Sequence, residues 1–327
     1  MTVTIPKEKF AAFREFLAGR GYAFQARPHQ EFLAKGRGAA VNLYSNGKVV
    51  IGGSSVDEQS AVRDYLERET GQRDEGSTSD SAELSALDIH QTRIGSDEVG
   101  KGDYFGPLVA AAVLASEFQA QRLKDVGVKD SKALEDHAIL EIAERVRRSI
   151  LVRGQWRLVV VPPSRYNILM TELGNLNRLL AWAHARAIED VLLFNEPCDL
   201  AIADQFGDPK YIQDALMAKG RRIRLVQTPH GERDVVVATA SVLARQEFLN
   251  QMEALGAKYG ERFPLGASRV EDFARDLVKK HGDEILLDTA KLHFATTARI
   301  VTSVDSLNEM LRARIKSPPP DLNRGSR

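Results

Sequence analysis

The sequence has few cysteines, no long hydrophobic runs and no net charge. Cys198 is the only cysteine among 327 residues, which excludes an internal disulfide and any zinc or iron–sulfur site built from several cysteines. No run of about 18 apolar residues is present, so we expect no segment that crosses a membrane. Lys plus Arg and Asp plus Glu both total 45, so any nucleic-acid site must be a local feature.

The N-terminus lacks the basic flank and the apolar stretch of about 7 to 15 residues that mark a secretion signal. We therefore expect a cytoplasmic protein. Hydrophobic residues make up 43% and charged residues 28% of the chain, as is usual for globular proteins. Because one domain commonly takes roughly 100 to 200 residues, the length predicts two folded units.

The first 70 residues predict a small α+β domain. Apolar spacing after Pro6 indicates a helix over residues 7–19, with Pro6 in its first turn. The turn at residues 45–48 contains Asn-Gly and predicts a β-hairpin over residues 39–51. A second helix is expected over residues 56–69.

Charge is uneven inside this first domain. Residues 1–52 contain eight Lys and Arg residues against three acids, although the whole protein is neutral. One interpretation is a basic patch that binds a polyanion, and the other is a set of ordinary solvated charges on helices and loops.

Beyond the first domain, composition and pattern predict three further parts. Residues 71–89 are rich in Gly, Ser, Thr and acids and predict a flexible linker. Residues 90–316 alternate strand-like runs with helical segments, which favours an α/β domain. Residues 317–327 contain three consecutive prolines and predict a disordered tail. The strands are expected near residues 108–114, 158–161, 200–203 and 223–226, and the longest helices, both largely buried, over 176–195 and 235–255.

The most unusual stretch begins with Asp97 and Glu98, which end an apolar run and lead into Gly100-Lys101-Gly102. The glycine spacing departs from the dinucleotide-binding pattern, and an apolar strand follows instead of a helix. Adjacent carboxylates suit hard divalent cations, and a glycine loop lets backbone N–H groups and an amine approach a phosphate. The alternative is an acidic pair that caps a turn.

Two other acidic positions are candidates for the same chemistry. Asp204 follows the apolar run 200–203, and ligands of α/β proteins gather where strands end. Glu232 and Asp234 stand just before the predicted helix at 235, where the field of the helix N-terminus also favours acids. Each of these acids is equally well explained as a turn or capping residue.

In combination, these segments closely resemble ribonuclease HIII, a family of type 2 ribonucleases H. The family's opening motif, Asp-Glu-x-Gly-Lys-Gly-Asp-x-Phe-Gly-Pro, stands here at residues 97–107 with Val99 in the variable position. Further segments that resemble the family follow in order: residues 128–132, 174–177, 179–185, 204–206, 238–245 and 263–268, and Lys291-Leu292-His293-Phe294.

The resemblance implies a ribonuclease H-like mixed sheet flanked by helices, preceded by a small domain similar in fold to the TATA-binding protein. It also implies an Asp, Glu, Asp, Glu metal site made of Asp97, Glu98, Asp204 and Glu232, with Asp234 as the alternative fourth ligand. The family has Lys-Ala-Glu where this chain has His230-Gly231-Glu232, about one residue closer to the following helix. Substrate contacts are expected from the following residues: Gly100, Lys101, Gly102, Ser131 and Lys132.

The activity that the resemblance implies is hydrolysis of the RNA strand of RNA–DNA hybrids to 5′-phosphate and 3′-hydroxyl ends. Two Mg²⁺ or Mn²⁺ ions roughly 4 Å apart can activate the attacking water and stabilise the leaving oxygen. Oxygen ligands suffice for these ions, so we expect His184 and His293 to pack or to form hydrogen bonds.

The expected partner is the hybrid, bound by a monomer with no membrane and no obligate protein partner. Two alternatives are a ribonuclease HII-like junction endonuclease and a hybrid-binding protein without catalysis.

Overall fold

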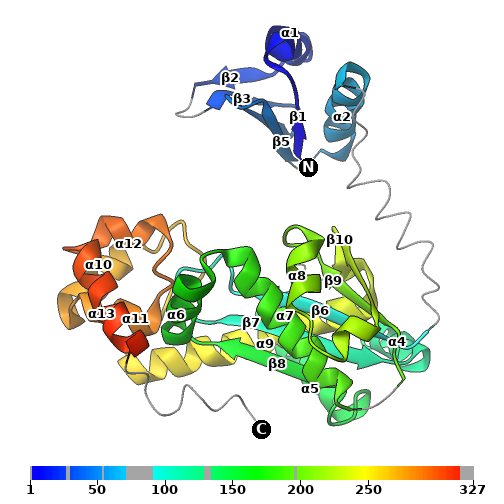
Figure 1. Cartoon of the computed structure of the whole chain (residues 1–327), viewed down its shortest axis with the longest axis vertical. Helices are drawn as coiled ribbons and strands as arrows, with labels where there is room; N and C mark the ends of the chain where they lie inside the picture. Colours follow the sequence, from blue (N-terminus) through cyan, green and yellow to red (C-terminus); the bar gives the residue numbers. More distant parts are fainter. Residues whose placement is uncertain are drawn as a thin grey trace. The chain divides into compact units, whose positions relative to one another are not determined.

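The computed structural model describes residues 2–26, 30–53, 55–70, 91–128, 134–194 and 197–316. The chain divides into two compact units between Leu87 and Asp88 (Figure 1). Each unit has its own hydrophobic core. The predicted linker and tail lie outside the described residues, as do Ser131 and Lys132.

The first unit is an antiparallel sheet with two helices. Its elements are β1 (Thr2–Thr4), a 3₁₀ turn (Lys7–Lys9), α1 (Phe10–Gly19), β2 (Ala23–Gln25), β3 (Gln30–Gly36), β4 (Ala39–Tyr44), β5 (Lys48–Gly53) and α2 (Val56–Thr70). The strand order is β1-β5-β4-β3-β2. The predicted hairpin and both helices are confirmed, but Pro6 precedes the 3₁₀ turn and α1 starts only at Phe10.

One face of this sheet carries the core. Alternate residues of a strand point to opposite faces, and Val41 and Leu43 of β4 are buried together with Phe13 of α1 and Leu66 of α2. The intervening residues of β4, Ala40, Asn42 and Tyr44, are only half-buried. The opposite face of the sheet is therefore not part of this core.

The second unit is built around a mixed five-stranded sheet. Its strands are β6 (Arg93–Val99), β7 (Leu108–Ala115), β8 (Trp156–Val161), β9 (Leu200–Asp204) and β10 (Arg224–Thr228). The order is β10-β9-β6-β7-β8, in which β6, β9 and β10 run parallel, while β7 is antiparallel to β6 and to β8. The predicted α/β class with a mixed sheet is confirmed.

Helices cover both faces of this sheet (Figure 1). Their bounds are α4 (Glu117–Asp125), α5 (Asp136–Ser149), α6 (Pro163–Leu173), α7 (Leu176–Leu192), α8 (Pro209–Ala215), α9 (Val235–Tyr259), α10 (Glu271–His281), α11 (Leu286–Thr289), α12 (Ala295–Ile300) and α13 (Val304–Lys316). Ser96 of β6 contacts α7, whereas Gly95, which points the other way, lies against the backbone of α9. Both long helices are thus packed directly on β6.

Some predicted bounds were wrong. The strand expected at residues 223–226 begins one residue later and continues to Thr228. Helix α7 ends at Leu192, whereas α9 continues to Tyr259, where Gly260 terminates it with a φ of 68°. None of the helices in the described part of the chain is long and apolar enough to cross a membrane.

The close packing of α9 on β6 predicts the effect of Gly95→Ala. A Cβ atom at Gly95 would lie 2.3 Å from backbone atoms of Val236 and Val237, so the helix would have to move. We expect the free energy of unfolding to fall by about 1–3 kcal/mol, the usual cost of overpacking. Denaturant unfolding followed by circular dichroism measures this change.

Gly102→Ala is the matched control, because a Cβ there meets nothing within 4 Å. Equal unfolding midpoints for both variants would show that α9 does not approach β6 this closely.

Candidate active site

Asp97 and Asp204 lie side by side on neighbouring strands. Strands β6 and β9 are parallel neighbours, and Ser96 lies opposite Ala203 in their register. Asp97 and Asp204 are the next residues on the two strands, so both lie at the carboxyl edge of the sheet. Ligands of α/β folds bind at this edge.

Asp97 is a buried carboxylate among other negative charges. Its Oδ1 accepts a hydrogen bond from the backbone N–H of Glu98 at 2.8 Å, and the hydroxyl of Ser241 on α9 is a second partner. Burial, together with the charges of Glu98 and Asp204, raises the pKa of Asp97 to about 8. Ionisation of Asp97 would therefore give the site more negative charge than its own hydrogen bonds compensate.

Glu98 points to the opposite face of the sheet and is held by two cationic or donor groups. Lys101 Nζ lies 2.7 Å from Oε1, and His184 Nε2 lies 2.9 Å from Oε2. Burial alone would raise the pKa of Glu98, but His184 and Lys101 outweigh it and lower the pKa to about 2. Glu98 is therefore an ionised carboxylate with both oxygens engaged.

Glu232 is brought toward Asp204 by its neighbour in the chain. The backbone N–H of Gly231 donates to Asp204 Oδ1 at 3.0 Å, within a 3₁₀ turn, Gly231–Arg233. A Cβ at Gly231 would lie 3.0 Å from Cα of Asp204, so this close approach favours glycine. Glu232 itself is partly exposed and contacts His230, with 3.3 Å between Oε1 and Nδ1.

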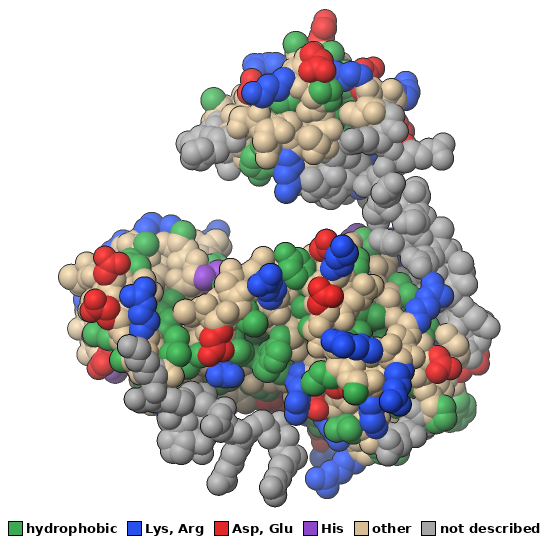
Figure 2. All heavy atoms as spheres, viewed as in Figure 1, with side chains coloured by type: hydrophobic (Ala, Val, Ile, Leu, Met, Phe, Trp, Pro, Cys, Tyr) green, Lys and Arg blue, Asp and Glu red, His purple; other side chains and the backbone are tan. Residues whose placement is uncertain are grey.

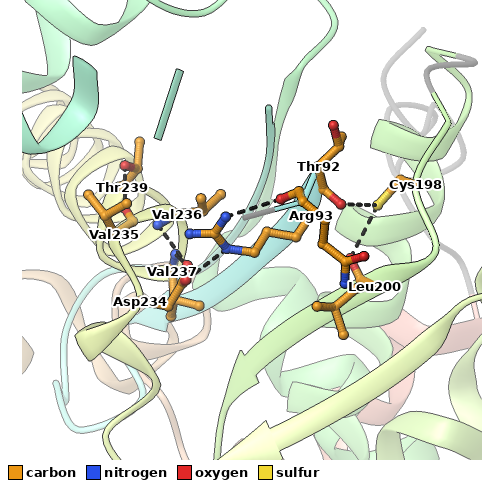
Figure 3. Close-up of polar contacts among 10 residues, drawn as sticks. Thr92, Arg93, Cys198, Leu200, Asp234, Val235, Val236, Val237 and Thr239 are labelled. Carbon is orange, nitrogen blue, oxygen red and sulfur yellow. Dashed lines mark hydrogen bonds and ion pairs between the residues drawn. The ribbon is translucent and has the colours of Figure 1, made fainter. Parts of the chain in front are cut away.

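Both carboxylate oxygens of Asp234 accept hydrogen bonds that stabilise the fold (Figure 3). Oδ1 caps α9 by accepting hydrogen bonds from the N–H groups of Val236 and Val237. Oδ2 accepts a hydrogen bond from Arg93 Nε at 2.7 Å, and neither side chain of this ion pair is more than 2% exposed. The arrangement favours Glu232 over Asp234 as the fourth carboxylate of the site.

The glycine loop combines a structural part with an exposed part. Gly100 is buried with a φ of 96°, and a Cβ there would lie 2.2 Å from the carbonyl oxygen of Pro107. Lys101 and Gly102 are exposed, and Gly102 has open space around it. Of the three predicted contact residues in this loop, Lys101 and Gly102 are therefore accessible to a ligand, whereas Gly100 shapes the turn.

Lys291 anchors the same loop from the C-terminal part of the chain. Its Nζ is fully buried and donates to the backbone carbonyls of Asp103, Phe105 and Gly106, at 2.9, 3.4 and 2.7 Å. Burial lowers the pKa of Lys291 to about 7. The sequence indicated this residue only through its resemblance to a family segment, and gave it no role.

The donor set suits a hard divalent cation. Asp97, Glu98, Asp204 and Glu232 offer carboxylate oxygens, and a bound cation would offset the negative charge concentrated around Asp97. Among the described residues, no three Asp, Glu, His or Cys side chains converge closely enough to form a metal-ligand cluster as they stand. Glu98 and Asp204 instead use their oxygens for hydrogen bonds within the protein.

Comparison with known proteins agrees with these features. The family described as Ribonuclease HII matches residues 94–297. Ribonuclease HIII of Protochlamydia amoebophila (strain UWE25) is 35% identical over 289 residues, which cover 88% of this chain and 92% of that protein. This chain belongs to the ribonuclease HIII family. Ribonuclease HIII of Chlamydia pneumoniae is 36% identical over 297 residues, with 90% and 95% of the two chains covered.

The fold comparison gives the same result. Bst-RNase HIII, solved in complex with Mn²⁺, matches with a TM-score of 0.61 and 27% identity, over 94% of this chain and 99% of that chain. The ribonuclease H2 from Pyrococcus horikoshii OT3 shares the fold with a TM-score of 0.54 and covers 68% of this chain. The predicted ribonuclease H-like fold is confirmed, and the protein is an endonuclease of the ribonuclease H type.

The contacts of Asp234 predict different effects for the two candidate fourth carboxylates. Asp234→Asn should lower the free energy of unfolding by about 3–5 kcal/mol, because Arg93 loses the charge of its buried partner. Glu232→Gln should leave stability near wild type and remove most of the nuclease activity. Denaturant unfolding and cleavage rates, measured on the folded fraction of each variant, test the assignment.

The opposite pattern would contradict it. A stable Asp234→Asn protein without activity, beside an active Glu232→Gln protein, would make Asp234 the fourth carboxylate.

Proposed function

We propose that this member of the ribonuclease HIII family hydrolyses the RNA strand of RNA–DNA hybrids in a divalent-cation-dependent reaction that leaves 5′-phosphate and 3′-hydroxyl ends. The observation that carries the proposal is the position of Asp97, Glu98 and Asp204 near the carboxyl edge of β6 and β9. The exposed residues Lys101 and Gly102 follow directly in the chain, where a phosphate backbone can approach.

Asp97, Glu98, Asp204 and Glu232 would hold Mg²⁺ or Mn²⁺. Such ions, when bound in a pair, supply an activated water and stabilise charge on the leaving oxygen. The protein's own contribution is to orient the carboxylates, and a bound cation would favour the ionised form of Asp97. Ser241 and the backbone N–H groups of Glu98 and Gly231 orient Asp97 and Asp204 by hydrogen bonds.

Binding of the hybrid is proposed to use local cations and the shape of the duplex. Figure 2 shows Lys and Arg side chains interspersed with Asp and Glu side chains on the visible face of the second unit. Lys101 stands at the site itself with a side chain that is 45% exposed. Contacts to phosphates and 2′-hydroxyl groups do not read base sequence, so we expect cleavage without sequence specificity.

The first unit is proposed to add affinity for the hybrid. Lys35 of β3 and Lys48 of β5 are exposed. Because core residues alternate with them along each strand, both lysines lie on the face of the sheet opposite the core. Tyr44 and Asn42 of β4 share this side of the sheet, which is opposite the core formed with α1 and α2. Two lysines beside neutral polar and aromatic side chains suit a phosphate backbone.

Asp97→Asn tests the proposed chemistry, because it removes a ligand charge at nearly constant volume. We expect hybrid cleavage in Mg²⁺ to fall by at least about 100-fold, which corresponds to about 2.7 kcal/mol. Hybrid binding in Ca²⁺ should remain close to that of wild type. Cleavage within a few-fold of wild type would disprove the carboxylate site.

The same substitution should raise thermal stability in metal-free buffer. The folded-state pKa of Asp97 lies above the ordinary value, so the carboxyl keeps its proton in the folded protein at pH values where it ionises in the unfolded chain, and stability falls as pH rises toward about 8. Asparagine carries no such charge. A lower melting temperature for Asp97→Asn at pH 8 would show that the charge of Asp97 stabilises the fold instead.

Salt dependence tests the role of the first unit in the full-length chain. In the double variant Lys35→Glu/Lys48→Glu, the slope of log affinity against log salt should shrink by about 1 for each lysine that contacts a phosphate. KM should rise and kcat should stay unchanged, because no proposed metal ligand lies in this unit. Arg68→Glu is the control, since Arg68 is an exposed cation on α2. Equal salt slopes for wild type and the double variant would remove the proposed role.

A further inference from the structure

His184 is a fully buried histidine on α7 that contacts several parts of the site. Its Nε2 lies 2.9 Å from Glu98 Oε2, and its Nδ1 lies 2.7 Å from Ser96 Oγ. Its ring stacks on Phe206, with 5.0 Å between centroids and 27° between planes. Phe206 follows Asp204 by two residues. One imidazole thus joins the strand ends that carry Glu98 and Asp204.

The available protons determine the direction of the hydrogen bond to Glu98. An ionised carboxylate only accepts hydrogen bonds, so the proton between Glu98 and His184 must be on Nε2. Ser96 has one hydroxyl proton and two neighbours, Nδ1 of His184 and the carbonyl oxygen of Ala111 at 2.8 Å. Whichever of these receives that proton, Nε2 of His184 donates to Glu98.

The two oxygens of Glu98 have different surroundings. Oε2 faces His184, whose side chain is 0% exposed and packed between the sheet and Phe206. Oε1 faces Lys101, whose side chain is 45% exposed and belongs to a loop. An exposed lysine can move away at little cost, whereas a buried, stacked imidazole is fixed. Oε1 is therefore the oxygen that can be released to another cation.

We propose that His184 is a positioning residue of the metal site: it fixes Oε2 of Glu98 so that Oε1 is presented to a divalent cation. This role rests on the proposed function, because it requires Glu98 to be a metal ligand. Groups that orient metal ligands without touching the metal typically change metal affinity about 10- to 100-fold when they are removed. His184 is placed to have an effect of this size.

Two substitutions separate this role from simple packing. Glutamine places an amide N–H near the position of Nε2 and can donate to Glu98, whereas methionine fills a similar volume without a strong donor. Both remove the contact of Nδ1 with Ser96, whose hydroxyl retains Ala111 as a partner. The difference between His184→Gln and His184→Met therefore reports the hydrogen bond to Glu98.

The experiment measures Mn²⁺ binding to the full-length protein by calorimetry, with cleavage rates and melting temperatures recorded in parallel. We expect His184→Met to bind Mn²⁺ about 10- to 100-fold more weakly than wild type, and His184→Gln to recover most of the loss. If His184→Met does not fold, His184→Asn replaces it, because asparagine is too short to reach Glu98.

Three results would overturn the proposal. Wild-type Mn²⁺ affinity in a folded His184→Met protein would remove the positioning role, and equal losses in the glutamine and methionine variants would assign His184 to packing. Equal Mn²⁺ binding by wild type and Asp97→Asn would disprove the metal site itself, and the role of His184 with it.

Discussion

The concentration of negative charge where β6 and β9 end is the constraint on which the active site depends. Parallel pairing places Asp97 and Asp204 side by side, and Glu98 follows on the same strand. Buried like charges are unfavourable, as the raised pKa of Asp97 shows. The fold limits this cost by sending Asp97 and Glu98 to opposite faces, where α9 provides Ser241 and α7 provides His184.

The buried charged groups fall into two kinds. Asp234 and Lys291 form hydrogen bonds that stabilise the fold. Asp234 caps α9 and pairs with Arg93. Lys291 donates hydrogen bonds to three backbone carbonyls of the glycine loop. The carboxylates at the strand ends are different. The hydrogen bonds of Asp97 do not offset the cost of ionising its buried carboxyl group. One oxygen of Glu98 is paired only with Lys101, whose side chain is exposed. Groups of the second kind are the ones available for chemistry.

Local sequence patterns predicted most of the strands and helices. The roles of Asp234 and His184 depend on contacts with residues far away in the chain, which local patterns do not show. The Asn-Gly turn and the apolar runs were sufficient for the hairpin and for most strands, because these signals involve neighbouring residues. Glu232 and Asp234 look alike in sequence, since both precede a helix. The structure assigns Asp234 to the fold through its cap on α9 and through Arg93, which is 141 residues away in the chain. Similarly, nothing near His184 in the chain identifies Glu98, 86 residues distant, as its partner.

The position of a bound metal ion shows whether the carboxylates where β6 and β9 end form the active site. Crystals soaked in MnCl₂ can be measured at a wavelength where manganese scatters anomalously. We expect an anomalous peak within bonding distance, about 2.0–2.3 Å, of carboxylate oxygens of Asp97, Glu98 and Asp204. A well-ordered site in which Mn²⁺ at saturating concentration binds elsewhere, or contacts none of these three side chains, would contradict it.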